Sequence, residues 1–325
     1  MGKIIRIGTR ESQLAVWQAE QVKKLLAENG FAAELVYIKS EGDVDLKTPL
    51  YEMGVQGVFT RSLDIALLNN RIDVAVHSMK DVPTQLPAGI IQASVLKRGP
   101  IHDLLVFKNT FSKNKYSTLN LPSGSAGIPH STFIVATSSI RRKAQWLNKF
   151  PDHQIENLRG NVNTRLGKLQ EENWDAAIFA QAGLERINLR PANSVILDWM
   201  LPAPAQGAIM VVCREDDQFS FKACDQFNDK HTAQCTKIER DFLRTLLGGC
   251  STPISAHAEI KNDKIHFKGN ILSLDGTKKV EIEKAIDIEG SENIGINAAN
   301  ELLAMGGKEI ADEIRKSGVS LNDEV

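Results

Sequence analysis

This chain of 325 residues lacks several features that mark common classes of protein. It has four cysteines, which form no C-x-x-C pair and have no histidine at metal-ligand spacing. We therefore expect no metal site, and so few cysteines in a chain this long argue against a disulfide framework. No apolar run approaches the roughly 20 residues that span a membrane, and the first residues lack a signal-peptide core. These absences favour a cytoplasmic protein that binds no membrane.

The chain also lacks an excess of charge of either sign. Its formal net charge is −1, so no overall field attracts nucleic acid. Neither the Walker A lysine motif nor G-x-G-x-x-G is present, although phosphate ligands remain possible. Any anion must therefore bind where basic residues gather locally.

Alternating strand and helix patterns fill the first two thirds of the chain. Strands are predicted at residues 3–8, 33–39, 73–77, 133–137, 155–158 and 175–180, and helices at 11–29, 63–68, 139–148 and 161–172. This alternation predicts parallel β-α-β units in two blocks. A further apolar strand at 208–213 could return to the first sheet.

The C-terminal part has a different pattern. A helix at 238–247 leads to strands at 256–260, 265–272 and 280–288, and helical stretches follow from residue 293. This order predicts an α+β domain with an antiparallel sheet. We expect domain 1 to comprise residues 1–98 and 208–226, domain 2 residues 102–202, and domain 3 residues 230–325.

Charged residues recur where the predicted strands end. Ser78, Lys80 and Asp81 follow one strand, and Pro83 prevents its simple continuation. The carboxyl ends of parallel strands are where open α/β sheets bind ligands. A carboxylate beside a cation in a binding site is one interpretation; a turn aspartate beside a solvated lysine is the other.

Arginines lie at the other strand ends. Arg141 and Arg142 occupy the first turn of a predicted helix, against its dipole, so they either serve a ligand or are merely exposed. Similar positions are held by Arg10, Arg159, Arg165 and Arg186. Because guanidinium groups bind carboxylates through two hydrogen bonds, this pattern predicts a ligand with several acidic groups.

Cys250 lies in a glycine-rich corner that follows a predicted helix and precedes Pro253. This order places the sulfur on a turn, where it could hold a group covalently; a packed cysteine is the ordinary alternative. Arg240 and Arg244 lie nearby in the sequence and are candidates for favouring the thiolate.

Together these stretches resemble the porphobilinogen deaminase family over almost the whole length. The most specific match is 239–254, similar to the family's cofactor-attachment signature; others lie at 9–12, 77–83, 137–142, 159–165, 182–186 and 202–207. The resemblance implies two periplasmic-binding-protein-like, doubly wound α/β domains facing a cleft, plus a smaller α+β C-terminal domain.

The resemblance also implies an activity, that of a transferase of haem biosynthesis. Such an enzyme, a hydroxymethylbilane synthase, joins four porphobilinogen molecules head to tail on a dipyrromethane cofactor and releases ammonia each time. Hydrolysis then frees hydroxymethylbilane. The partners implied are porphobilinogen and the growing oligopyrrole, and the family is usually monomeric.

Residue roles follow from the same resemblance. Asp81 would be the catalytic carboxylate, and Cys250 would hold the dipyrromethane through a thioether. The other cofactor-binding residues implied are Ser78, Lys80, Thr137, Ser138, Ser139, Arg141, Arg142, Arg159, Gly160 and Arg165. The substrate-binding residues implied are Arg10, Ser12, Gln18, Arg186 and Gln206.

The chain departs from the family pattern at a few positions. Glu52 and Gln56 stand where lysines are common, so we expect Arg61 or Lys47 to replace any clamp there. His102 stands where an arginine is common, and Pro204-Ala205 replaces a more usual Val-Gly pair. A non-catalytic solute-binding module for a polycarboxylate is the alternative function; a nucleic-acid binder fits less well because the basic residues are scattered.

Overall fold

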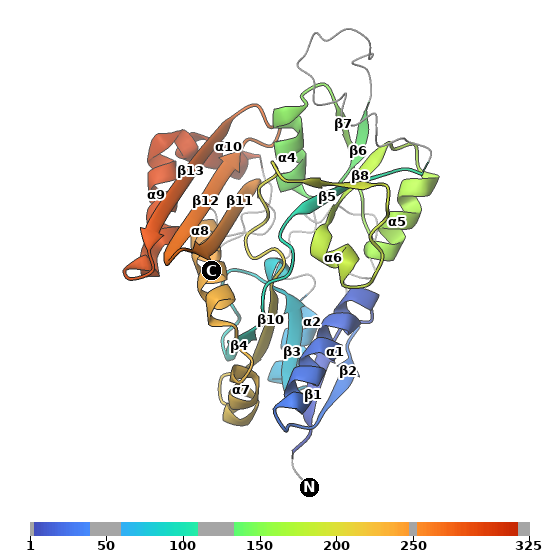
Figure 1. Cartoon of the computed structure of the whole chain (residues 1–325), viewed down its shortest axis with the longest axis vertical. Coiled ribbons are helices and arrows are strands. Elements are labelled where there is room, and N and C mark those ends of the chain that lie inside the picture. Colours follow the sequence, from blue (N-terminus) through green and yellow to red (C-terminus); the bar gives the residue numbers. More distant parts are fainter. Residues whose placement is uncertain (1–2, 40–59, 110–132, 247–251, 318–325) are drawn as a thin grey trace.

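Three sheets organise the residues that the structure, a computed structural model, describes: 3–39, 60–109, 133–246 and 252–317. Two sheets have five strands and belong to α/β units, and the third has three strands. Figure 1 shows the two α/β units one above the other and the third unit beside them. The predicted fold class is confirmed, whereas the residue limits of the domains stay a prediction.

The first sheet has the order β2-β1-β3-β10-β4. Its strands are β1 (Ile5–Thr9), β2 (Ala33–Tyr37), β3 (Val74–Ser78), β4 (Ile90–Val95) and β10 (Ile209–Arg214). The first three are parallel, and β10 runs antiparallel between β3 and β4. The strand expected after Gly207 therefore does return to this sheet.

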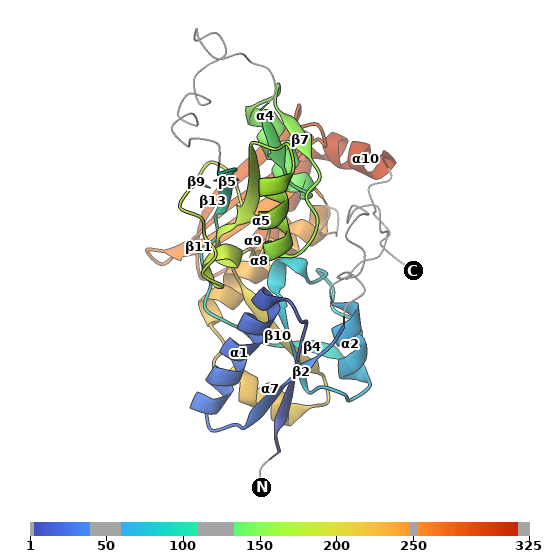
Figure 2. The same ribbon diagram turned by 90° about the vertical axis from the view of Figure 1, so that its right-hand side faces the viewer.

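Helices cover both faces of the first sheet, because successive apolar side chains along its strands point to opposite faces. Helix α1 (Gln13–Glu28) packs with α7 (Gln218–Asp225) on one face, and α2 (Arg61–Leu68) packs on the other. Figure 2 shows α1 and α2 on opposite sides of the strands. Neither β4 nor α7 was expected from the sequence.

The second sheet repeats the first. Its order is β7-β6-β8-β5-β9, with β5 (Asp103–Phe107), β6 (Ile134–Ala136), β7 (Gln154–Glu156), β8 (Ala176–Ala180) and β9 (Ser194–Leu197). Here β6 is parallel to β7 and β8, and β5 runs antiparallel to β8 and β9. Both sheets are therefore mixed, because each receives an antiparallel strand when the chain crosses between units.

Three helices connect the parallel strands of the second unit: α4 (Ile140–Lys149), α5 (Val162–Glu171) and α6 (Gln181–Glu185). Trp146 of α4 packs on one face of the sheet, and Leu169 of α5 packs on the other. These helices were predicted within a residue or two, apart from the short α6. Strands β5 and β9 were not predicted.

Two segments that cross between the α/β units lie side by side. The Leu96 N–H donates to Ile209 O at 3.0 Å, and the Gly99 N–H donates to Gly207 O at 3.0 Å. Gly207 has φ +87°, and a Cβ there would lie 2.7 Å from Gly99 O. The crossing therefore requires glycine at position 207.

The third unit packs helices on one face of an antiparallel sheet. It contains α8 (Lys230–Leu246), β11 (Ile254–Lys261), β12 (Lys264–Leu272), β13 (Lys279–Asp287), α9 (Ile294–Leu302) and α10 (Lys308–Lys316). Helix α8 begins eight residues earlier than the sequence predicted. In the described ranges, no helix combines the length and the apolar character that crossing a bilayer demands.

Candidate active site

The turn after β3 carries the predicted catalytic carboxylate. A single 3-10 turn, Met79–Asp81, follows the last strand residue, Ser78. Asp81 is exposed, whereas Met79 before it is buried and anchors the turn. From α1, the buried Gln18 donates its Nε2 hydrogen to Ser78 Oγ at 2.8 Å. Ser78 and Gln18, predicted to bind different ligands, are thus direct partners.

Lys80 connects this turn to the second α/β unit. Its Nζ donates to Gln206 Oε1 at 3.4 Å, and Gln206 is fully buried. Gln206 Nε2 in turn donates to Ile101 O at 2.7 Å and to Asp103 Oδ1 at 2.9 Å. Burial lowers the pKa of Lys80 to about 8, although the Asp81 charge acts in the opposite direction. Lys80 is therefore a cation that ordinary changes of pH can neutralise.

Asp103 at the start of β5 is a buried carboxylate that binds two of the predicted arginines. Its Oδ2 accepts from Arg141 at 2.7 Å, and its Oδ1 accepts from Arg142 at 2.8 Å. The backbone carbonyls of Leu201 and Ile178 also accept from these guanidinium groups. Burial alone would raise the pKa of Asp103, but the two arginines hold it well below its ordinary value.

The structure excludes one interpretation of Arg141 and Arg142, that they are merely exposed, whereas a role in binding a ligand stays a prediction. They are 4% and 5% exposed, so they are not exposed helix arginines, and an internal carboxylate already pairs with them. Burial fixes each of the two guanidinium groups in one orientation. Within the described part of the chain, Arg142 Nε has no hydrogen-bond partner, which leaves one buried donor for a ligand oxygen.

The turn after β7 contributes Arg159, Gly160 and Arg165. Gly160 has φ +113°, and its carbonyl accepts from Arg165 Nε at 2.7 Å. Arg159 is buried. Burial, and after it the charge of Arg142, lowers the pKa of Arg165 to about 10, while the Asp81 charge opposes the shift. The Arg142 and Asp81 charges therefore act on Arg165 in opposite directions.

Predicted hydroxyl residues cap the helix that follows β6. Ser139 is the N-cap of α4 and accepts from the Arg142 N–H. Thr137 Oγ1 accepts from the Ser139 N–H at 3.2 Å, and Ser138 between them is partly buried. Capping satisfies backbone donors at the helix start and so holds Arg141 and Arg142 in place.

Three of the predicted substrate residues, Arg10, Ser12 and Gln18, lie in or next to α1. Ser12 is its N-cap, and Arg10 precedes it after β1. Burial, and then the Arg10 charge, lowers the pKa of the neighbouring His77 to about 4. Arg186 lies across the unit boundary: it donates to Gly207 O at 2.6 Å and stacks over the Trp17 ring at 5.6 Å. Burial lowers the pKa of Arg186 to about 10.

Basic side chains outnumber carboxylates where the α/β units meet. Lys80, Arg141, Arg142, Arg159 and Arg165 act electrostatically on one another or on the two carboxylates Asp81 and Asp103. An unbalanced positive charge of this kind favours a ligand with several carboxylates. The donor set therefore fits a dipyrromethane, whose rings carry acetate and propionate groups.

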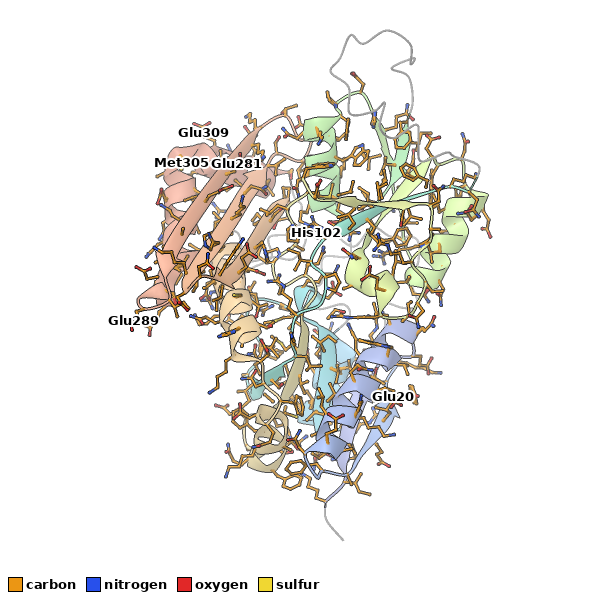
Figure 3. All side chains as sticks on the ribbon, in the orientation of Figure 1. Glu20, His102, Glu281, Glu289, Met305 and Glu309 are labelled. Carbon is orange, nitrogen blue, oxygen red and sulfur yellow. The ribbon has the colours of Figure 1, made fainter. Side chains whose placement is uncertain are left out.

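Cys250, Lys47, Glu52 and Gln56 lie outside the described residues, so the attachment site and the expected clamp stay predictions. Arg61 is described, and it lines a 440 Å³ pocket between α2 and the segment after Pro83. Figure 3 places His102 near the centre of the molecule. Its carbonyl accepts from the Gln181 N–H at 3.0 Å at the start of α6.

Sequence reasoning missed two buried carboxylates. Besides Asp103, Glu239 of α8 accepts from both arms of Arg98, at 2.6 and 2.9 Å, and from the Ala205 and Ala258 N–H groups. Glu239 thereby joins the third unit to the crossing segments. The available signals were an aspartate opening the apolar run at 103–107 and an acidic residue within the matched stretch 239–254.

Arg240 and Arg244 were candidates for favouring the thiolate of Cys250, and the structure gives each of them other hydrogen-bond partners. Arg240 donates to backbone carbonyls beside Asp81, and Arg244 donates to Asp241 Oδ1 at 2.8 Å.

Two family models match the chain. The model described as porphobilinogen deaminase, dipyromethane cofactor binding domain, matches residues 5–222, and porphobilinogen deaminase, C-terminal domain, matches residues 233–304.

Curated relatives match over nearly the full length. A porphobilinogen deaminase of Chloroherpeton thalassium is 40% identical, covering 97% of this chain and 99% of the relative. That of Geobacter sulfurreducens is also 40% identical, covering 99% and 98%. Among solved structures, the methionine binding protein MetQ matches with a TM-score of 0.40 and 14% identity, over 73% of this chain and 93% of that chain. A likeness at that level supports no conclusion about function.

Proposed function

Because the chain belongs to the porphobilinogen deaminase family, we propose that Asp81 is its catalytic carboxylate and that Cys250 holds its dipyrromethane cofactor. The chain is a porphobilinogen deaminase of tetrapyrrole biosynthesis. It joins four porphobilinogen molecules head to tail, with loss of ammonia at each step and a final hydrolysis. The observation that supports the residue roles is an exposed carboxylate, Asp81, whose charge acts on the half-buried cations Lys80 and Arg165, beside the buried Arg141, Arg142 and Arg159.

The cations bind the carboxylate groups of the pyrrole rings. When bound, the dipyrromethane supplies the pyrrole carbon to which the first substrate unit is joined. Arg142 offers it an unused buried donor, and Arg159 and Arg165 add positive charge from the turn after β7. Because burial and hydrogen bonds already orient these guanidinium groups, binding costs little further side-chain entropy.

Asp81 stabilises the positive charge that develops when porphobilinogen loses ammonia. At about 4 Å and an effective dielectric constant near 20, an ion pair gains roughly 4 kcal/mol. If this gain is realised only in the transition state, it raises the rate about a thousandfold. The Asp81 charge in turn acts on the neighbouring cations Lys80 and Arg165 and favours their charged forms.

The substrate is held from α1 and α6 in this proposal. Arg10 and Arg186 bind its carboxylates, and Ser12, Gln18 and Gln206 fix the surrounding backbone and side chains. We further propose that the enzyme works as a monomer in the cytoplasm, as the family resemblance implies. Light scattering coupled to gel filtration checks the first point: a mass near 35.8 kDa is expected, and a dimer mass would contradict it.

Intact mass tests the attachment site. Purified wild-type protein should exceed its sequence mass by two linked pyrrole rings, and Cys250→Ser should have the bare mass. Cys235→Ser is the matched control, because Cys235 is buried in the core of the third unit. A pyrrole adduct on Cys250→Ser, or its loss from Cys235→Ser alone, would show that Cys250 does not hold the cofactor.

A further inference from the structure

One guanidinium group from the third unit holds the turn that carries Asp81. Arg240 NH1 donates to Val82 O at 2.9 Å and to Met79 O at 3.4 Å, and NH2 donates to Pro83 O. Met79, Val82 and Pro83 lie on both sides of Asp81 in the sequence. Three contacts from one side chain therefore flank the residue proposed to act in the reaction.

The turn that carries Asp81 is short, a single 3-10 turn. Within it, the Val82 N–H donates to Met79 O at 3.2 Å, and Pro83 provides no N–H to continue a helix. The carbonyls at the end of such a turn need outside donors. Arg240 supplies charge-assisted donors, which form stronger hydrogen bonds than neutral donors. It thereby fixes the path of the backbone that follows Asp81.

Arg240 is itself held firmly. Its neighbours on α8, Glu239 and Phe242, are both fully buried: Glu239 binds Arg98, and Phe242 packs against Phe267. These contacts fix the rotation of α8 about its axis. Arg240 therefore transmits the position of the third unit to the Asp81 turn in the first unit.

We propose that Arg240 is a positioning residue for the reaction, which sets the orientation of Asp81 through the backbone of residues 79–83. This inference rests on the proposed role of Asp81. Because Arg240 binds the backbone carbonyls of Met79, Val82 and Pro83, we expect it to act on the rate of the chemical step, while substrate affinity and cofactor attachment depend on other residues.

The first test compares Arg240→Gln and Arg240→Lys with Lys237→Gln. Lys237 lies one turn earlier on α8, is exposed and pairs with Asp241 at 2.6 Å. We expect Arg240→Gln to lower kcat roughly a hundredfold, as a misplaced catalytic group does, with KM and cofactor mass nearly unchanged. Arg240→Lys should recover part of the rate, because an ammonium group reaches fewer carbonyls. Wild-type kcat in Arg240→Gln would overturn the proposal.

Two further measurements separate positioning from a general structural role. In the cofactor-free Cys250→Ser background, hydrogen–deuterium exchange of residues 76–86 should accelerate with Arg240→Gln and not with Lys237→Gln. In an Asp81→Asn background, adding Arg240→Gln should lower the residual rate less than twofold, because the group being positioned is already gone. Unchanged exchange, or the full hundredfold loss in the Asp81→Asn background, would refute positioning.

The same series distinguishes the two hypotheses. If Asp81→Asn keeps wild-type activity, the proposed role of Asp81 fails and this inference falls with it. If Asp81→Asn is inactive while Arg240→Gln turns over normally, only the role of Arg240 fails.

Discussion

In the first α/β unit, β3 ends at Ser78 beside Ile209, the first residue of the antiparallel strand β10. In the second unit, β8 ends at Ala180 beside Asp103, the first residue of the antiparallel strand β5. Ile209 and Asp103 thus hold corresponding places in two sheets of the same strand order. One unit has a buried apolar residue there, and its carboxylate, Asp81, lies in the exposed turn.

This difference separates two uses of an aspartate. Asp103 forms hydrogen bonds with Arg141, Arg142 and Gln206. Its charge is therefore neutralised inside the fold, where it orients the two guanidinium groups. Asp81 is exposed and held through its backbone, so its charge remains available to a reacting group. In our proposal the second unit contributes most of the arginines that bind ligand carboxylates, and the first unit contributes the catalytic carboxylate Asp81.

The largest expected effect is on turnover, from Asp81→Asn. Because the amide carries no charge, we expect kcat to fall about a thousandfold, which corresponds to roughly 4 kcal/mol. The melting temperature and the cofactor mass should match wild type, because Asp81 is exposed. Steady-state kinetics and calorimetry check this. Near-normal turnover would contradict the role of Asp81 in the reaction.

The next effect is on stability, from Asp103→Asn. Removing this charge leaves two buried guanidinium groups uncompensated, so the free energy of unfolding should fall by about 3 kcal/mol. Asp152→Asn is the control, since Asp152 is an exposed residue of the same unit. Urea unfolding measures both; equal stability of the two variants would mean that Asp103 has no structural role.

A smaller effect is expected from Arg142→Ala. Loss of its donors should lower kcat/KM for porphobilinogen roughly thirtyfold, as for a hydrogen bond to a charged group. Lys143→Ala, at the exposed neighbouring position, should behave as wild type. Elongation at the wild-type rate in Arg142→Ala would contradict a role in holding the ligand.

The smallest effect is a pH dependence that belongs to Lys80. Its pKa is about 8 in the folded protein, below the ordinary 10.5, so the unfolded chain binds more protons between these values. Stability then rises with pH in this window. Between pH 8 and 9, cofactor-free wild type should gain about 1 kcal/mol over Lys80→Met. If the free energies of unfolding of wild type and Lys80→Met changed equally between pH 8 and 9, burial would not lower this pKa.

Much of the fold followed from periodicity in the sequence. The helices that became α1, α4 and α5 were predicted closely because their apolar spacing and capping residues are local signals. Strands β4, β5 and β9 were missed because their partners come from distant parts of the chain. The first turns of α8 are polar in sequence, yet Thr232 and Cys235 are buried there by tertiary packing.

The site divides in the same way. Their positions at strand ends marked Lys80, Asp81, Arg142 and Arg165 as candidates, and the Asp81 and Arg142 charges act on both Lys80 and Arg165; their roles stay predictions. Nothing local predicted that Asp103 would pair with Arg141, because the register of two antiparallel strands decides it. The contact of Arg240 with the Asp81 turn likewise depends on how α8 packs against the first unit.

A time course of intact mass after mixing with porphobilinogen tests the division between the two aspartates most directly. Wild type and Asp103→Asn, kept below its melting temperature, should both gain mass in steps of one pyrrole unit. Asp81→Asn should start at the cofactor-loaded mass and stay there. Stepwise gain by Asp81→Asn at the wild-type rate would contradict the assignment of the chemistry to that carboxylate.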